Sequence, residues 1–128
     1  MSFDILILDD EPIVGERLKA SLEKNNHSLE TFINPIDALK RLEEKKFDIV
    51  ITDIRMDDFS GIDVLESVRK KNSRTKVIMI TGYATLEIAR ESLTKGAFDF
   101  IAKPFKIKEI RGAIEKAADA LRIENQGQ

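Results

Sequence analysis

Five short apolar segments alternate with five helix-like segments along the chain, and this alternation restricts the fold more than any other feature. The strand-like segments cover residues 4–9, 28–33, 47–53, 75–81 and 98–102, and the helix-like segments cover 12–25, 35 onward, 60–71, 85–95 and 107–123. Strands separated by helices of this length need crossover connections, so they run parallel in one sheet. The sequence therefore predicts an α/β fold with helices on both faces of a parallel sheet.

The helix-like segments carry apolar residues three or four positions apart, which is typical of helices with one buried face. The residues expected to point inward include Leu18, Leu22, Ile36, Leu39, Leu42, Ile62, Leu65, Val68, Ile110, Ile114 and Leu121. Helix starts are indicated by Pro12, by Asn34-Pro35 and by Ser60, and Gly96 indicates a helix end.

The charge content of the strand-like segments predicts their order in the sheet. Segments 4–9, 47–53 and 75–81 are apolar through their middles, as expected of strands buried on both faces. Segments 28–33 and 98–102 each contain a charged residue, which edge strands tolerate. We therefore expect a doubly wound five-stranded sheet of order 2-1-3-4-5, whose topological switch point lies between strands one and three.

The composition excludes several classes of protein. The chain has 128 residues, enough for one domain, with 42% hydrophobic and 34% charged residues and no cysteine. No apolar run approaches the ~18 residues that span a bilayer, and the start lacks a secretory signal, so we expect a cytoplasmic protein without a membrane segment. The net charge of -2 gives no general attraction to nucleic acid, and the absence of cysteine excludes disulfides and thiolate chemistry.

Polar residues follow the predicted strands at the end where open α/β sheets bind ligands. Asp9 and Asp10 follow the first strand, and Asp53 ends the third, so these acids flank the switch point. Thr81 ends the fourth strand, and Lys103 follows the fifth. Three converging carboxylates would repel one another unless a cation lay among them, and the cation best suited to such oxygen ligands is Mg²⁺.

An open acidic cluster of this kind is suited to a phosphoryl group, because Mg²⁺ commonly completes its coordination with phosphate oxygens. Asp53 is the available carboxylate nucleophile. Lys103 would offer its charge to the phosphoryl oxygens, and the Thr81 hydroxyl would offer a hydrogen bond. We therefore interpret this end of the sheet as a phosphoryl-transfer site.

Several residues at this end of the sheet also form a known family pattern. They are Asp9-Asp10, Asp53 followed by Met56 and Gly61, Thr81-Gly82-Tyr83, and Phe100 three residues before Lys103-Pro104. With them the chain resembles the receiver domain of bacterial two-component response regulators over essentially its whole length. The resemblance implies a flavodoxin-like (CheY-like) fold, with residues 1–123 as the receiver domain and 124–128 as a polar tail or the start of a linker.

The resemblance implies roles for the residues of the acidic cluster. Asp53 would accept a phosphoryl group from the phosphohistidine of a sensor histidine kinase. Mg²⁺ would be held by Asp10, Asp53, the backbone carbonyl of Arg55 and, through water, Asp9. The domain would then act as a regulatory switch and not as a turnover enzyme, although it would catalyse its own phosphoryl transfer and slow self-dephosphorylation.

The resemblance also implies how the phosphoryl group would be sensed. Lys103 would contact it, Thr81 would move toward it, and Phe100 would swing inward, which would remodel the face made by helix four, strand five and helix five. A cis Lys103-Pro104 bond is expected as well. One departure from the family pattern is Asp57, which stands where proline is usual, so the loop after Asp53 is expected to be more mobile and more acidic.

The end of the last helix, from Leu121 to Gln126, resembles the junction before the ATPase domain of NtrC-like enhancer-binding transcription activators. The chain is therefore either a stand-alone regulator or the receiver part of a protein with a C-terminal effector domain, with transcription as the expected output. A homodimer through the face of helix four, strand five and helix five is a further expectation. No DNA-binding element is seen, so direct contact with nucleic acid is not predicted.

Other interpretations of these residues are less well supported. Taken singly, the acids are typical of helix starts and turns, and the aromatic residues of packing. A phosphatase of the haloacid dehalogenase type would need an aspartate two residues after Asp53, where Arg55 stands. Flavin or dinucleotide binding would need a glycine-rich loop after the first strand, and an interaction module that is never phosphorylated would not need the acidic cluster. His27, the only histidine, is expected in solvent, so Ser-His and Cys-His catalysis lack support.

Overall fold

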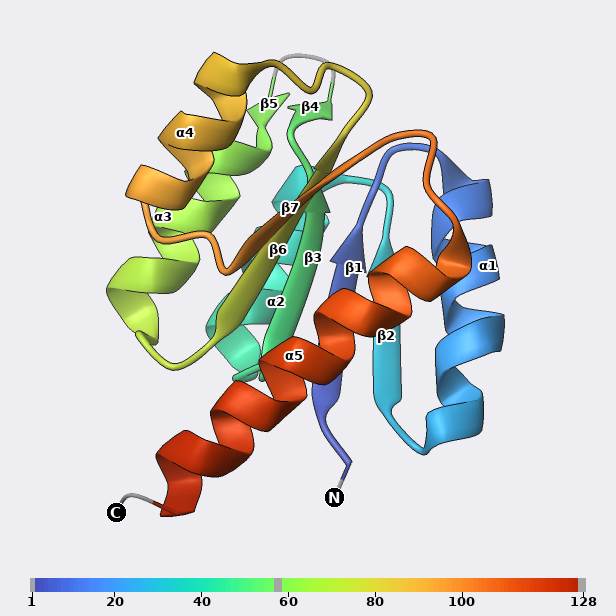
Figure 1. The fold of residues 1–128 in the computed structure, drawn as a ribbon. Helices are drawn as coiled ribbons and strands as arrows, with labels where there is room; N and C mark the ends of the chain where they lie inside the picture. Colours follow the sequence, from blue (N-terminus) through green and yellow to red (C-terminus); the bar gives the residue numbers. More distant parts are fainter. Residues whose placement is uncertain (1, 57–58, 127–128) are drawn as a thin grey trace.

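A five-stranded parallel sheet forms the centre of the molecule in the computed structural model, which describes residues 2–56 and 59–126 (Figure 1). Across the sheet the strands are β2 (Ser28–Phe32), β1 (Asp4–Leu8), β3 (Ile49–Asp53), β6 (Lys76–Thr81) and β7 (Asp99–Ala102). Because β6 and β7 are the fourth and fifth strands of this sheet, the predicted order 2-1-3-4-5 is confirmed. Strands β1 and β3 pair directly, so their carboxyl ends lie side by side.

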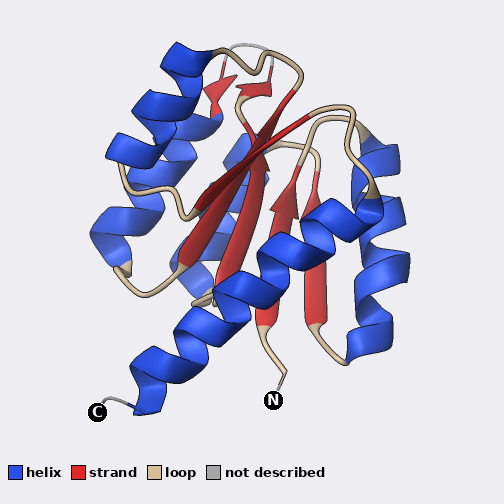
Figure 2. Cartoon of the chain, viewed as in Figure 1, coloured by secondary structure: helices blue, strands red, loops and turns tan. Residues whose placement is uncertain are grey.

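Helices cover both faces of the sheet, as the sequence predicts (Figure 2). They are α1 (Pro12–Leu22), which continues into the 3₁₀ turn η1 (Glu23–Asn25), and α2 (Pro35–Glu44), α3 (Gly61–Lys71), α4 (Leu86–Thr94) and α5 (Ile107–Gln126). Helices α1 and α5 pack on one face, and α2, α3 and α4 pack on the other. The domain is therefore a three-layer sandwich with its loops at the two ends of the sheet.

Alternate residues of the central strands feed two separate cores. Ile5 and Ile7 of β1 belong to the core under α1 and α5, whereas Leu6 and Leu8 belong to the core under α2 and α3. All four side chains are completely buried, as expected for a strand covered on both faces. This two-sided burial explains why β1 is apolar from Ile5 to Leu8.

The structure corrects three sequence-based expectations about local structure. The segment after Asp53, expected to be an acidic loop, contains a short antiparallel hairpin of β4 (Arg55–Met56) and β5 (Phe59–Ser60). Strands of two residues have no periodicity that a sequence could show. Asp57, whose effect on the loop was a prediction, lies outside the described residues. Helix α5 continues beyond the expected end at Ile123 and reaches Gln126.

The third correction concerns Ile36, which was expected to point into the core but is 58% exposed. It lies in the first turn of α2, just after the end of the edge strand β2, where the described residues leave it largely exposed. Ala38 is the buried residue of this helix instead. The Asn34 side chain accepts a hydrogen bond from the backbone N–H of Ile36, so the predicted cap of α2 is confirmed.

His27 is a further correction, because it is buried and not in solvent. Its Nδ1 atom accepts a hydrogen bond of 3.2 Å from the backbone N–H of Phe3, and the two rings lie 5.9 Å apart. Burial lowers the pKa of the imidazole from its ordinary value. The polar residues next to His27 in the sequence indicate a solvent-exposed loop. The hydrogen-bond partner of His27 lies 24 positions away, so the local sequence does not show that His27 is buried.

Candidate functional site

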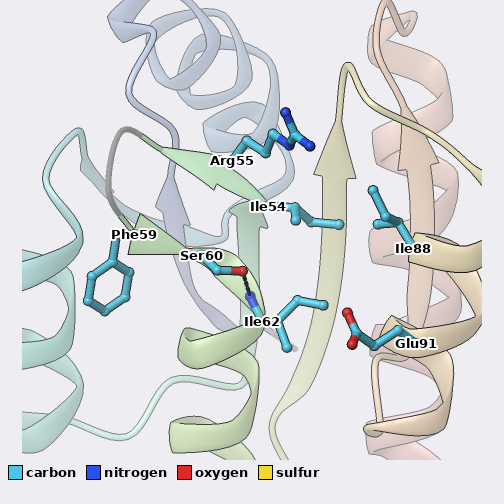
Figure 3. Close-up of a pocket in the computed structure, with 7 residues that line it drawn as sticks. All are labelled: Ile54, Arg55, Phe59, Ser60, Ile62, Ile88 and Glu91. Carbon is cyan, nitrogen blue, oxygen red and sulfur yellow. Dashed lines mark hydrogen bonds between the residues drawn. The ribbon is translucent and has the colours of Figure 1, made fainter.

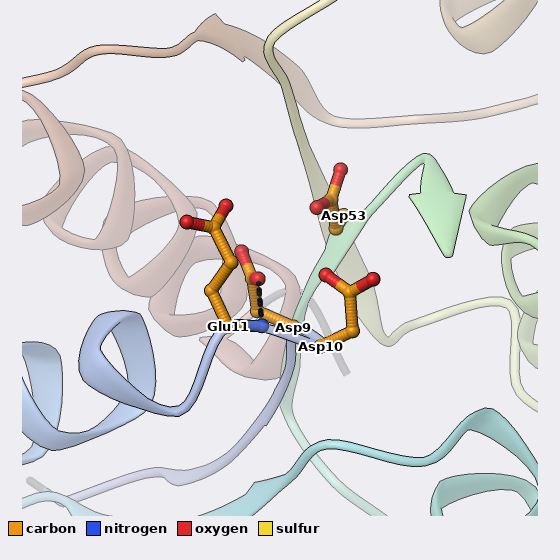
Figure 4. Close-up of side chains that lie close together, drawn as sticks. All are labelled: Asp9, Asp10, Glu11 and Asp53. Carbon is orange, nitrogen blue, oxygen red and sulfur yellow. Dashed lines mark hydrogen bonds between the residues drawn. The ribbon is translucent and has the colours of Figure 1, made fainter. Parts of the chain in front are cut away.

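Four carboxylates gather at the carboxyl ends of β1 and β3 (Figure 4). Asp9, Asp10 and Glu11 follow β1, and Asp53 is the last residue of β3. One oxygen from each lies within 4.8 Å of the others. The predicted convergence of Asp9, Asp10 and Asp53 is therefore present in the structure, and Glu11 joins them.

Lys103 reaches into this cluster from the loop after β7. Its Nζ atom lies 2.7 Å from Oδ2 of Asp9, 2.9 Å from Oε1 of Glu11 and 3.0 Å from Oδ2 of Asp53. The Lys103 side chain is only 14% exposed. Although burial opposes the charged form, the contacts with the three carboxylates outweigh it and raise the pKa of Lys103. The lysine is therefore a fixed positive charge.

Asp53 is a buried carboxylate on which opposing electrostatic effects act. Burial raises the pKa of its carboxyl, and the charge of Asp9 adds to this rise, while Lys103 opposes it. The Oδ1 atom of Asp53 accepts a hydrogen bond of 3.3 Å from the backbone N–H of Arg55. One oxygen thus faces the loop after β3 and the other faces Lys103.

The start of α3 fixes the backbone that carries Asp53. The Ser60 hydroxyl accepts a hydrogen bond from the N–H of Ile62, and the N–H of Gly61 donates to the carbonyl of Ile54 at 2.7 Å. A Cβ atom at Gly61 would overlap the carbonyl oxygen of Asp53. Only glycine therefore allows α3 to begin so close to the end of β3, which is the physical reason for Gly61 in the family pattern.

Thr81 and Tyr83 lie on the neighbouring strand end. The Thr81 side chain is completely buried at the end of β6, and its Oγ1 atom accepts a hydrogen bond of 3.0 Å from the backbone N–H of Tyr83. The backbone N–H of Lys103 donates to the Thr81 carbonyl, which ties the β7 loop to β6. The Lys103-Pro104 bond is cis, as expected. Phe100 is half-buried and packs against the core under α2 and α3.

Two features of this site were missed from the sequence. Glu11 binds Lys103, but its position before Pro12 suggested only a helix start. The guanidinium of Arg55 lies 4.1 Å from the centre of the Tyr83 ring, a cation–π distance. The sequence contains one signal for the contact between Arg55 and Tyr83. Arg55 stands two positions after Asp53, and Tyr83 stands two positions after Thr81, so both follow predicted site residues.

The residues of the acidic cluster fit a hard divalent cation. Oδ2 of Asp9 is buried and, apart from the ion pair with Lys103, has no hydrogen-bond partner within the described residues. The donor set consists of carboxylate oxygens, which Mg²⁺ and Ca²⁺ prefer to nitrogen or sulfur. Asp10 lies exposed on the outer side of the cluster, so the arrangement is open to solvent and to a further ligand.

A separate hollow of about 470 Å³ lies between the β4–β5 hairpin and α4 (Figure 3). Its lining combines aliphatic side chains with one cation and one anion, Arg55 and Glu91. Arg55 extends from β4 toward the carboxyl end of β6, so this hollow adjoins the acidic cluster without containing it.

Comparison with known proteins identifies the family. Residues 5–115 match the family described as "Response regulator receiver domain". The chain belongs to this family. It is 37% identical over 120 residues to the response regulator protein PilR of Pseudomonas aeruginosa, covering 94% of this receiver domain and 26% of PilR. It is 31% identical over 120 residues to the transcriptional regulatory protein ZraR of Klebsiella oxytoca, covering 94% of this domain and 27% of ZraR.

A solved structure agrees with this assignment. The beryllofluoride-activated NtrC4 receiver domain dimer matches 92% of this chain and 98% of that chain, with a TM-score of 0.87 and 27% identity. The receiver domain described here spans about a quarter of the length of the curated relatives PilR and ZraR. Within residues 2–56 and 59–126, no helix combines the length and apolar character needed to cross a membrane.

Proposed function

We propose that this receiver domain is a signalling switch in which Asp53 takes a phosphoryl group from the phosphohistidine of a sensor histidine kinase. The observation that carries the proposal is the position of Lys103, whose ammonium contacts acids from two different strand ends at once. An ammonium held in this way can pair with phosphoryl oxygens as soon as they arrive.

The proposed step needs only residues of this cluster and the donor. A carboxylate oxygen of Asp53 attacks phosphorus, the P–N bond of the phosphohistidine breaks, and the imidazole leaves with the bonding electron pair. Lys103 balances the negative charge on the transferring group. Arg55 stands two positions after Asp53 and cannot act as a general acid for a poor leaving group. The acyl phosphate on Asp53 therefore persists and hydrolyses slowly.

A bound Mg²⁺ would neutralise charge on the transferring phosphoryl oxygens. The residues proposed to hold it are Asp10, Asp53 and the backbone carbonyl of Arg55, with Asp9 acting through water. The convergence of the carboxylates supports this assignment.

Phosphorylation is proposed to shift an existing equilibrium between two conformations of the α4–β7–α5 face. Thr81 would turn toward the phosphoryl group, and Phe100 would move further inward from its half-buried position. Leu86 and Leu93 of α4 are 67% and 51% exposed, so this face offers apolar surface for a second copy of the domain. The NtrC4 receiver domain was solved as a dimer in its beryllofluoride-activated form, which supports the homodimer proposed here.

The biological setting is proposed from the relatives. PilR is named a response regulator and ZraR a transcriptional regulatory protein, and both are several times longer than the matched part. We infer that the domain acts in the cytoplasm and controls a C-terminal effector domain that regulates transcription. The receiver domain itself would contact neither nucleic acid nor membrane.

The test is phosphorylation by a small donor. Wild-type protein, incubated with acetyl phosphate and Mg²⁺, should gain one phosphoryl group by intact mass, and Asp53→Asn should gain none. Equal labelling of both proteins would refute the assignment of Asp53.

A further inference from the structure

Arg55 and Tyr83 connect the two loops that border the phosphorylation site. Arg55 begins β4 just after β3, and Tyr83 follows the end of β6. The guanidinium carbon lies 4.1 Å from the centre of the Tyr83 ring, within the range of a cation–π contact. Tyr83 is 57% exposed, so the ring shields little apolar core and contributes mainly this contact.

The backbone N–H group of each residue also donates a hydrogen bond to a side chain of the site. The N–H of Arg55 donates to Oδ1 of Asp53 at 3.3 Å, and the N–H of Tyr83 donates to Oγ1 of Thr81 at 3.0 Å. Asp53, Arg55, Tyr83 and Thr81 therefore form one continuous series of contacts.

The Arg55 side chain lacks a carboxylate partner in the described part of the chain. It makes no ion pair there, although Glu91 lines the same hollow. Lys103, in contrast, is already bound by three carboxylates. Among the described residues, Arg55 is thus the cation beside Asp53 whose side chain contacts a neutral ring and forms no ion pair with a carboxylate.

A phosphoryl group on Asp53 would compete with Tyr83 for this cation. It carries a charge of about -1.5 to -2 near neutral pH and three acceptor oxygens. Paired hydrogen bonds from a guanidinium to phosphate oxygens are stronger than a cation–π contact at an exposed site. The backbone N–H of Arg55 already lies 3.3 Å from Oδ1 of Asp53, so its side chain starts beside the carboxylate.

We propose that Arg55 is a second phosphoryl-binding cation, which leaves the Tyr83 ring when Asp53 is phosphorylated and thereby releases Tyr83 and its loop. This inference rests on the proposed function of Asp53. It concerns the guanidinium of Arg55, which is distinct from the backbone carbonyl proposed to bind Mg²⁺. Tyr83 is then a positioning residue that holds Arg55 in the unphosphorylated state.

The composition of the chain supplies a direct probe. Tyr83 is the only tyrosine, and tryptophan is absent, so tyrosine fluorescence reports on this ring alone. Beryllofluoride with Mg²⁺ serves as the phosphoryl mimic, and its binding is followed independently by ¹⁹F NMR. In wild-type protein, saturating beryllofluoride should move the Tyr83 emission to the value of unliganded Arg55→Gln, and Arg55→Gln itself should show no further change.

Two variants should change beryllofluoride affinity in opposite directions. Arg55→Gln should weaken binding by about threefold to tenfold, with Arg55→Lys between it and wild type. Tyr83→Leu should strengthen binding by about twofold to fivefold, because the resting partner of Arg55 is gone. A merely structural role would weaken binding in both variants.

The inference would be overturned by an unchanged Tyr83 emission on saturation, or by equal affinities of wild type and Arg55→Gln. Its failure can be told apart from failure of the proposed function. If wild-type protein binds no beryllofluoride by ¹⁹F NMR and gains no phosphoryl group from acetyl phosphate, the function of Asp53 is wrong, and the role of Arg55 fails with it.

Discussion

The ammonium of Lys103 lies 3.0 Å from Oδ2 of Asp53, although the two residues are 50 positions apart in the chain. The same ammonium lies 2.7 Å from Oδ2 of Asp9, which follows a different strand. A single cation thus holds together acids from β1 and β3 at the switch point of the sheet. This arrangement gives the buried Asp53 a counter-charge, which opposes the rise in its pKa that burial and Asp9 cause.

Removing this cation should destabilise the domain. Lys103→Gln leaves Asp9 and Asp53 buried without their counter-charge, and we expect a loss of about 3 kcal/mol in the free energy of unfolding in the absence of Mg²⁺. The matched control is Lys95→Gln, whose partner Glu66 is exposed, so its loss should cost far less stability. Urea unfolding measures both, and equal small losses would contradict the role given to Lys103.

Gly61 should tolerate no side chain. Gly61→Ala places a Cβ atom on the carbonyl oxygen of Asp53, so we expect a loss of about 2 to 4 kcal/mol in stability and slower phosphorylation by acetyl phosphate. Gly112→Ala is the control, since a Cβ there meets nothing within 4 Å and alanine favours the helix by about 0.5 to 1 kcal/mol. Thermal unfolding that ranks the two variants in the other order would refute this account of Gly61.

The buried His27 should make stability depend on pH. Burial lowers the pKa of the folded imidazole below its ordinary value of 6.5, so the unfolded chain takes up the proton first as the pH falls. Neutral His27 therefore makes its full contribution to the free energy of unfolding above about pH 6.5. This contribution is lost as the pH falls from there toward the lower pKa of the folded imidazole.

The check compares wild type with His27→Gln by urea unfolding at pH 7.5 and pH 5.5. At the higher pH the variant should be less stable by about 1 to 2 kcal/mol, since the hydrogen bond from Phe3 to Nδ1 is lost. At the lower pH the difference should narrow. A difference that stays constant or widens would show that His27 is not held neutral by the fold.

Mg²⁺ should stabilise the folded domain through the acidic cluster. A ligand present at 100 times its dissociation constant raises the free energy of unfolding by about 2.7 kcal/mol, a change that thermal unfolding detects easily. Asp10→Asn should reduce this gain, and EDTA should abolish it in wild type. Asp37→Asn changes an exposed acid in the first turn of α2, so that variant should keep the full gain. The same Mg²⁺ response in Asp10→Asn as in wild type would contradict the proposed ligand set.

The central strands were predictable because burial on both faces leaves a clear pattern. Strand β3 is apolar from Ile49 to Ile51, and the change to Thr52 and Asp53 predicts a carboxylate at the end of the strand. The same reasoning placed Asp9 and Asp10 beside it, since parallel strands end at one edge. The meeting of these acids followed from topology alone.

Side-chain partners were less predictable, because they depend on contacts between distant residues. His27 lies in a polar stretch, and only the folded chain shows that it accepts a bond from Phe3. Ile36 has the spacing of a core residue but lies after an edge strand, where the described residues leave it 58% exposed. The β4–β5 hairpin was missed because each of its strands has two residues, too few to show a pattern.

Asp53 is the residue proposed to carry the phosphoryl group, and its position in the chain can be read out chemically. Wild-type protein treated with acetyl phosphate and Mg²⁺, then reduced with borohydride, should contain homoserine in place of one aspartate, and peptide sequencing by mass spectrometry should find it at position 53. Homoserine at Asp9, Asp10 or any other position instead would contradict the account.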